Sequence, residues 1–252
     1  VGDLVEKWRF PTDAVVTSSP SVAPVVGPDG TTRRLVFASS WDGFIYSIDF
    51  ETGAEAWRFA WDDQPGASFP AAGSVTVADV DGDGREDVVV AGTGFPPRVM
   101  VYPGQVDGTL GEGVTTEISS FDELWAGDIT GDGKADLLTR GSGWPSRIEI
   151  YPQTAGLVFG SVVTTEVWNH LLGAVVDVDG DGHEDLVLDN GDGFPPRMYV
   201  HQGLGDGSLD HVSETEVWSF VTLAAGQFNE DGLGDVLTGS EGSPQRVWTH
   251  LG

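Results

Sequence analysis

The sequence contains no cysteine, which excludes disulfide bonds, thiol catalysis and zinc–thiolate sites. Basic residues are also scarce: 12 Lys and Arg stand against 40 Asp and Glu, for a formal net charge of −28. Nucleic-acid binding depends on Lys and Arg that neutralise phosphates, so we expect no nucleic-acid partner. The apolar segments are short and interrupted. We therefore expect neither membrane insertion nor a signal peptide within this chain.

An acidic segment of nine residues recurs four times. The copies, which we call the first to fourth acidic loops, cover residues 79–87, 128–136, 177–185 and 227–235, and their last residues are 49, 49 and 50 positions apart. A second element, Gly-x-Pro-x-Arg, follows each copy and ends at Arg98, Arg147, Arg197 and Arg246. A Thr-Glu element precedes the later copies, at 116–118, 165–168 and 215–218. Three elements in phase indicate a repeat architecture.

Short runs rich in Val, Ile, Tyr and Trp, bounded by Gly, Asp and Pro, fill each repeat and favour β-strands. Each full repeat has room for four strands, so we predict an all-β, five-bladed β-propeller with four-stranded antiparallel blades. We expect one domain over residues 1–252, with the first blade at about 11–62 and the other four at about 72–252.

The first 70 residues lack the acidic loop but share the period, since Trp8-Arg-Phe recurs at Trp57. The last repeat ends before its fourth strand. We therefore predict that a strand at residues 1–10 completes the fifth blade and closes the ring, which would cover the open sheet edges.

These elements carry a family resemblance. The last four repeats resemble FG-GAP/VCBS repeats, the units of integrin α-chain propellers and of several bacterial and fungal propeller proteins. The first blade, with Trp41-Asp-Gly and two Trp-Arg-Phe runs, is similar to a PQQ-like blade. Quinoprotein dehydrogenases that resemble this blade use larger rings with many such blades, so we expect no PQQ cofactor.

The acidic loops predict calcium binding. Calcium takes six to eight oxygen ligands, and side chains at positions 1, 3 and 5 of a tight loop converge on one point. Position 7 would offer its carbonyl and position 9 a further carboxylate. Strands rather than helices flank the loops, and Val90 stands where an EF-hand needs Glu. The predicted metal residues are Asp79, Asp81, Asp83, Arg85, Asp87, Asp128, Thr130, Asp132, Lys134, Asp136, Asp177, Asp179, Asp181, His183, Asp185, Asp231 and Asp235.

The four loops differ in charge. The first and third have four carboxylates, the second has three, and the fourth has two, with amides at Gln227 and Asn229. We therefore predict two to three calcium sites with a structural role, and a degenerate fourth. Acidic surface turns from salt adaptation are the alternative, but adaptation would not place aspartates in register.

The sequence favours a binding module over an enzyme. Propeller glycosidases need a carboxylate pair about 5–10 Å apart near the axis. The predicted inner strands contain none before their acidic loops, and Asp122 with Glu123 is the only pair in a loop expected there. We predict no catalytic residues, and carbohydrate as the ligand. The alternative is an integrin-like protein-interaction or adhesion module, or a purely structural domain of a secreted protein. We expect an extracellular, cell-surface or periplasmic location.

We predict the ligand surface on the face opposite the acidic loops, where aromatic rings gather beside Arg and amide groups. Such groups suit a sugar ring or a carboxylate-bearing protein. The alternative is that the repeated Arg pairs with an acid of a neighbouring blade and the aromatic packs between blades. Residues that depart from the repeat are therefore the better candidates. The candidates are Trp41, Trp144, Arg98, Arg147, Arg197, Arg246, Asn169 and His170.

Overall fold

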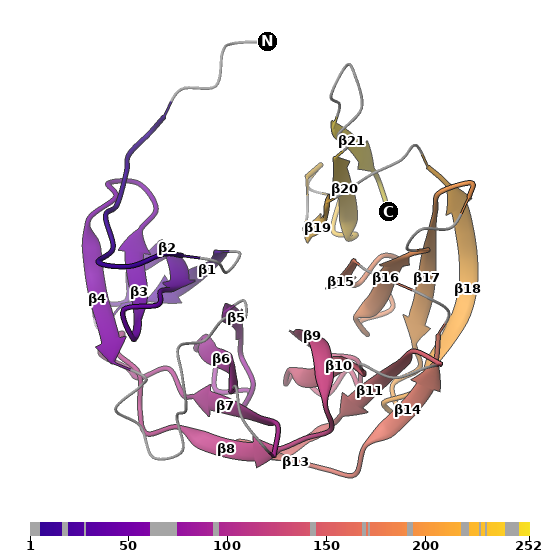
Figure 1. Ribbon diagram of the computed structural model, residues 1–252, viewed down its shortest axis with the longest axis horizontal. Helices are drawn as coiled ribbons and strands as arrows, with labels where there is room; N and C mark the ends of the chain where they lie inside the picture. The colour runs from indigo at the N-terminus through magenta and orange to yellow at the C-terminus, as the bar shows by residue number, and fades with distance from the viewer. Residues whose placement is uncertain are drawn as a thin grey trace. The chain divides into compact units, whose positions relative to one another are not determined.

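The structure is a computed structural model whose regular elements are all β-strands. The residues that it describes are 6–16, 20–27, 29–60, 75–92, 96–141, 145–167, 170, 172–190, 194–217, 222–226, 228–229, 231–239 and 247–252. The described strands form five antiparallel sheets of three or four strands and one short hairpin (Figure 1). The fold is thus an all-β, five-bladed β-propeller, as the repeats predicted. Among the described residues, no helix is long and apolar enough to cross a membrane.

The chain divides into two compact units, which we describe separately: residues 1–120 with 155–158, and residues 121–154 with 159–252. The predicted single domain over residues 1–252 stays a prediction. The first unit holds two blades, β1 to β4 (Ser21–Val26, Thr32–Ser39, Phe44–Asp49 and Glu55–Ala60) and β5 to β8 (Val75–Ala78, Asp87–Gly92, Arg98–Tyr102 and Val114–Glu117).

The second unit holds the other three blades. The third blade consists of β9, β10, β11 and β14 (Phe121–Gly127, Asp136–Gly141, Arg147–Tyr151 and Val163–Glu166). The fourth consists of β15 to β18 (Gly173–Val176, Asp185–Asp189, Arg197–Gly203 and Leu209–Glu216). The fifth consists of β19, β20 and β21 (Thr222–Gly226, Asp235–Gly239 and Val247–His250). A hairpin of β12 and β13 (Gln153–Ala155 and Val158–Phe159) follows β11 in sequence.

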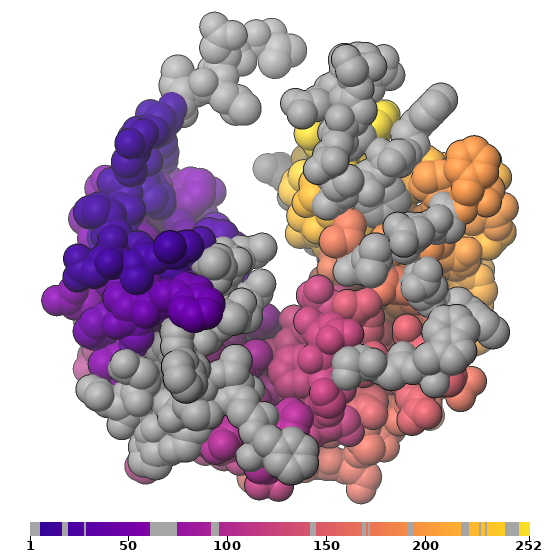
Figure 2. Space-filling model, in the orientation of Figure 1, coloured from indigo at the N-terminus to yellow at the C-terminus, as the bar shows by residue number. Residues whose placement is uncertain are grey.

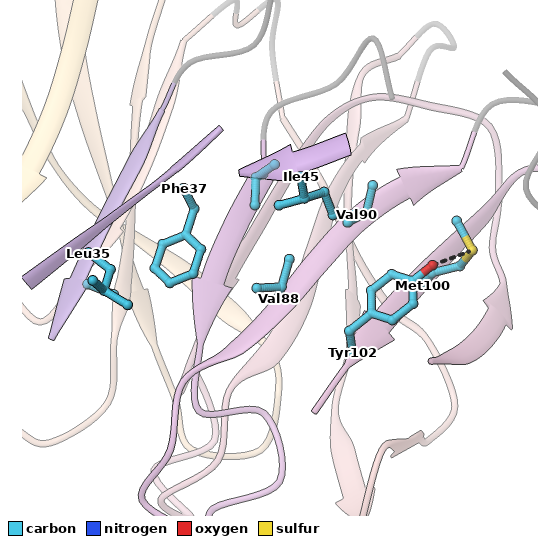
Figure 3. Packing of buried hydrophobic residues seen from close by; sticks show 9 residues of the cluster. Leu35, Phe37, Ile45, Val88, Val90, Met100 and Tyr102 are labelled. Atoms are coloured by element: carbon cyan, nitrogen blue, oxygen red, sulfur yellow. Dashed lines mark hydrogen bonds between the residues drawn. The ribbon is translucent and has the colours of Figure 1, made fainter. Parts of the chain in front are cut away.

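Within each unit, apolar side chains of neighbouring blades pack face to face. In the first unit, Leu35, Phe37 and Ile45 of the first blade share a cluster with Val88, Val90, Met100 and Tyr102 of the second (Figure 3). In the second unit, Ile148 and Ile150 pack with Leu186 and Leu188, which joins the third and fourth blades. The third and fourth blades also lie side by side at the surface of this unit (Figure 2). Because the middle strands are covered on both faces, they read as continuous apolar runs rather than alternating ones.

The N-terminal segment differs from the prediction. Residues 6–10 form no strand. The Trp8 indole N–H instead donates to the Phe50 carbonyl at 2.8 Å, and its ring packs with Val36, Tyr46 and Ile48 of the first blade. This site gives the indole both an acceptor and an apolar surface. Residues 1–5 lie outside the described residues, and the fifth blade has three strands in its described part. Closure of the ring by residues 1–10 therefore stays a prediction.

Candidate metal centres

Each acidic loop connects the first and second strands of its blade, as predicted. The loops join β5 to β6, β9 to β10, β15 to β16 and β19 to β20, and the ninth residue of each loop begins the second strand. In each of these four blades the first strand thus leads directly into the acidic loop.

The ninth residue is a buried anchor. Asp87 has no exposed surface, and its carboxylate accepts the N–H of Val80 at 2.9 Å and of Gly104 at 2.8 Å. In each of the other loops, the carboxylate of the ninth residue also accepts two backbone N–H groups. The donors are Thr130 and Gln153 for Asp136, Val178 and Gly203 for Asp185, and Phe228 and Gly252 for Asp235. Burial raises the pKa of Asp87 to about 6 and also raises the pKa of Asp136 and Asp185. The anchor ties the loop to the end of the third strand or to the chain just after it.

In the first three loops, the first residue shapes the turn around its own side chain. The Asp79 carboxylate accepts the N–H of Gly82 at 2.9 Å and of Gly84 at 2.8 Å. Both glycines have positive φ, 76° and 83°, a conformation that other residues rarely adopt. Asp177 makes the same bonds to Gly180 and Gly182, at 2.7 and 3.1 Å. The loop shape is therefore set by backbone hydrogen bonds.

Two loops bring three carboxylates together. Oxygens of Asp79, Asp81 and Asp87 lie within 4.8 Å of one another, and so do oxygens of Asp177, Asp179 and Asp185. Two oxygens bound to one calcium at 2.3–2.6 Å are at most about 5 Å apart, so both groups fit one ion. The donors are all hard oxygens, which favours calcium or magnesium over softer metals. These groups contain positions 1, 3 and 9 of the predicted ligand set.

The second loop offers fewer charges but has an orphaned oxygen. Thr130 occupies position 3, and its Oγ1 is buried with no hydrogen-bond partner among the described residues. A buried hydroxyl without a partner is destabilising unless it finds one, and a cation held by Asp128 and Asp136 would supply it. In the fourth loop the Asn229 amide donates to Asp231 at 2.8 Å, which satisfies that carboxylate internally. Gln227 lies outside the described residues.

Positions 5 and 7 pair with each other. The guanidinium of Arg85 contacts the Asp83 carboxylate, and Lys134 Nζ lies 3.4 Å from Asp132 Oδ2. In the third loop position 7 is His183, and the amide of Gln202 donates instead, to Asp179 at 2.6 Å and to Asp181 at 3.0 Å. These contacts offset part of the repulsion between the carboxylates. Sequence reasoning assigned only a carbonyl to position 7 and missed this side-chain role.

The repeated arginines face acids of their own blade. Arg98, Arg147 and Arg197 each begin a third strand, directly opposite Glu117, Glu166 and Glu216 on the fourth. Arg197 forms ion pairs with Glu214 at 2.6 Å and with Glu216 at 3.5 Å. The pairing explains why the Arg element and the Thr-Glu element keep the same phase in the sequence. For Arg197, the acid comes from the same blade and not from a neighbouring blade, as the alternative proposed.

The other ligand candidates are placed differently from one another. Trp41 lies in the turn between β2 and β3 and is 47% exposed. Trp144, Asn169 and Arg246 lie outside the described residues. His170 is 4% exposed, so it is a core residue and not an open ligand contact.

His170 belongs to a buried aromatic cluster that sequence reasoning missed. Its ring centroid lies 5.6 Å from that of Tyr199 and 6.3 Å from that of His201, and His201 lies 5.2 Å from His211. Burial lowers the pKa of both His170 and His201 to about 4. Both rings are therefore neutral at physiological pH. The only sequence signal for this cluster was that His201 lies within a segment with the pattern of a β-strand, which is consistent with burial of its side chain.

The acidic pair Asp122 and Glu123 lies in β9, not in a loop. The register of β9 shifts here: Glu123 lies opposite Arg140 and Phe121 opposite Gly141, so Asp122 is the extra residue of a bulge. Glu123 also pairs with Arg140 at 3.9 Å. Glu123 thus has a cationic partner within its own blade.

A hollow of about 620 Å³ lies in the first unit, beside the turns that join β1 to β2 and β3 to β4. Leu35 and Trp57 contribute apolar surface, and Arg33, Asp29, Asp49 and Asp107 contribute charge. These turns lie on the same side of their blade as the acidic loops do in the others. The hollow is thus on the face opposite the predicted ligand surface.

Comparison with known proteins assigns the repeats. Residues 79–139, which contain the first and second acidic loops, match the family model described as an FG-GAP-like repeat. This segment of the chain thus matches an FG-GAP-like repeat. A comparison with curated proteins gives no match. The PQQ-like character of the first blade stays a prediction.

Solved structures support the propeller fold over nearly the whole chain. The crystal structure of BBS1N in complex with ARL6DN is 13% identical with a TM-score of 0.62, and the match covers 98% of this chain and 70% of that one. The exotype rhamnogalacturonan lyase YesX is 14% identical with a TM-score of 0.54, over 93% of this chain and 47% of that one. The WD40 repeats of RRP9 are 14% identical with a TM-score of 0.51, and the match covers 95% of this chain and 77% of that one. The chain thus spans 70% of the first of these structures but less than half of the second. At these identities the likeness concerns the fold.

Proposed function

We propose that this propeller is a calcium-stabilised, non-catalytic binding module. The observation that carries the proposal is the convergence of Asp79, Asp81 and Asp87, repeated by Asp177, Asp179 and Asp185. A bound divalent cation would supply the positive charge that offsets these carboxylates. The chain supplies the rest: buried anchors at position 9, and backbone turns closed around position 1.

The calcium part of the proposal is tested by titration calorimetry on the full chain. We expect two or three sites in wild type, and one site fewer in Asp177→Ala. Asp29→Ala is the matched control, because Asp29 lies in the equivalent turn of the first blade, which has no acidic loop. Heat signals that are absent in wild type, or unchanged in Asp177→Ala, would contradict the proposal.

We propose carbohydrate as the ligand class, on the surface opposite the acidic loops. Trp41 supports this placement, because its ring is 47% exposed in a turn on that side. A glycan array with and without EDTA, followed by Trp41→Ala and Trp144→Ala, tests it. Binding that is lost in these variants at unchanged melting temperature supports the placement. Binding that survives them but is lost in Arg33→Glu would move the site to the hollow of the first unit.

A protein partner is the second candidate, favoured by one observation. Phe194 is 96% exposed in the connection between β16 and β17. Exposed aromatic side chains often act as anchors in protein interfaces. The solved relative with the TM-score of 0.62 is a complex with another protein. A glycan array without signal, together with a pull-down of a partner that Phe194→Ser abolishes, would favour this candidate. An extracellular or periplasmic location is part of both proposals.

A further inference from the structure

The third acidic loop contacts the second through a reciprocal pair of hydrogen bonds. The backbone N–H of Glu184 donates to the carbonyl of Asp128 at 2.8 Å. The backbone N–H of Asp128 donates to the Glu184 carboxylate, at Oε2, also at 2.8 Å. Glu184 therefore holds both polar groups of the Asp128 backbone. We call this contact the Glu184 clamp.

The two loops also fit each other sterically. A Cβ atom added to Gly127 would overlap the Glu184 carboxylate, and one added to Gly131 would overlap the imidazole of His183. The second loop and the residue before it thus have glycine where side chains of the third loop lie against them. This close approach makes the position of one loop dependent on the position of the other.

The clamp acts on the residue that shapes the second loop. The side chain of Asp128 accepts the N–H of Asp132 at 3.1 Å and of Gly133 at 2.8 Å, which closes the loop around it. A shift of the Asp128 backbone would move its carboxylate, the first donor of its candidate site. Glu184 in turn lies between His183 and Asp185, inside the third loop. Anything that orders the third loop therefore also orders Asp128.

The joint between the fourth and third loops provides an internal comparison. There, Gly234 N–H donates to the Asp177 carbonyl at 2.6 Å, and Leu233 lies against Gly180 as His183 lies against Gly131. Residue 234 has no side chain, so only the backbone bond is present. The carboxylate of Glu184 is thus an addition to a backbone joint that both pairs of loops share.

We propose that cation binding in the second loop is coupled to cation binding in the third through the Glu184 clamp. This inference rests on the proposed calcium binding. A cation in the third loop fixes Glu184, Glu184 fixes Asp128, and the second loop then binds with less ordering to complete. Coupling of this kind is reciprocal, so the second loop also raises the affinity of the third.

The test follows single loops by NMR on the full ¹⁵N-labelled chain. The amide of Gly133 reports on the second loop, that of Gly182 on the third and that of Gly84 on the first, because each donates to the first aspartate of its loop. Calcium is titrated into wild type, Asp177→Ala, Glu184→Ala and the double variant. We expect Asp177→Ala to raise the calcium midpoint at Gly133 by about fivefold or more. In the Glu184→Ala background the same substitution should leave that midpoint nearly unchanged.

Two further variants keep the test decisive. Glu184→Gln retains an acceptor for the Asp128 N–H and should keep the wild-type midpoint at Gly133, even if Glu184→Ala fails to fold. Glu86→Ala changes the equivalent residue of the first loop and should not alter Gly133. The coupling would be overturned if Asp177→Ala left the calcium midpoint at Gly133 unchanged. It would also be overturned if Asp177→Ala shifted that midpoint equally in wild type and in the Glu184→Ala background. Absence of any calcium response at Gly84, Gly133 and Gly182 would instead overturn the proposed calcium binding.

Discussion

The turn between β1 and β2 and the loop between β15 and β16 join equivalent strands, but they are stabilised differently. The turn uses one carboxylate: Asp29 accepts the N–H of Thr31 at 3.0 Å and its hydroxyl at 2.6 Å. The loop uses four carboxylates, one of them fully buried, and three of them converge. The turn satisfies its own polar groups, whereas the loop gathers like charges that need a counter-charge. The same blade architecture thus accepts a self-sufficient connection or one in which carboxylates converge.

Calcium removal should separate the two kinds of blade most strongly. Extracellular calcium modules bind with Kd of about 10⁻⁴–10⁻³ M, so about 10 mM calcium adds roughly 1.4–2.7 kcal/mol for each filled site. Two or three sites give a rise of many degrees between calorimetric melts in EDTA and in calcium. Hydrogen exchange should place the gain in the blades with acidic loops and leave β1–β4 unchanged. If calcium raised hydrogen-exchange protection equally in all blades, the proposed difference between blades with and without acidic loops would be wrong.

Asp185→Ala should have the next largest effect. It leaves the buried N–H groups of Val178 and Gly203 without acceptors, at a cost of about 2–5 kcal/mol. Urea denaturation in EDTA measures this loss without any contribution from calcium. Asp29→Ala, the control in the exposed turn of the first blade, should cost far less. If both variants lose a similar amount of stability, the buried Asp185 carboxylate contributes no more to stability than an exposed turn residue does.

Acidification should weaken the fourth blade through its buried histidines. The pKa of His170 and of His201 is about 4 in the folded chain, below the usual 6.5, so the unfolded chain binds more protons between these values. Stability therefore falls as the pH drops from 6.5 to 4, by about 2–3 kcal/mol for each ring.

Aspartates such as Asp87, whose pKa is raised to about 6, act in the opposite direction over the same range. The measurement is therefore a difference: urea denaturation of wild type minus His201→Phe across this pH range in EDTA. Parallel pH profiles for the two chains would contradict the role of His201.

Trp8→Ala should give the smallest effect and should be confined to the first blade. The half-buried indole loses its bond to Phe50 and its packing on Tyr46, for about 1–2 kcal/mol. The loss should be the same in EDTA and in calcium. If the loss instead appears as lower hydrogen-exchange protection in β21, residues 1–10 complete the fifth blade as the sequence predicted. Trp8→Phe, which retains an apolar ring, serves as the matched control.

The sequence predicted the blades and the acidic loops because both depend on local features at fixed spacing. A single repeat is enough to recognise the glycines of the loop, the spacing of its aspartates and the apolar middle strands. The repeated Trp-Arg-Phe motif shows what local sequence does not determine. At Trp57 the motif forms part of strand β4, and the Trp57 ring centroid lies 5.8 Å from that of Phe37, whereas at Trp8 the same motif forms no strand. Tertiary contacts decide between the two conformations.

The burial of His170 was likewise not predictable, because its neighbours Tyr199 and His201 come from a strand about thirty residues later. The role of Glu184 was missed for a similar reason. It contacts the preceding repeat, and no pattern within one repeat shows what residue 184 meets in another. Contacts between repeats are thus the part of the site that the periodicity does not contain.

The Glu184 clamp also has a consequence for the order in which the chain is made. Its two ends are 56 residues apart, and the later end holds the earlier one. At a synthesis rate of about 5–20 residues per second, Asp128 waits roughly 3–11 s on the ribosome before its partner has been added. The contact that holds Asp128 is thus completed only after translation has passed the first strand of the next blade, β15.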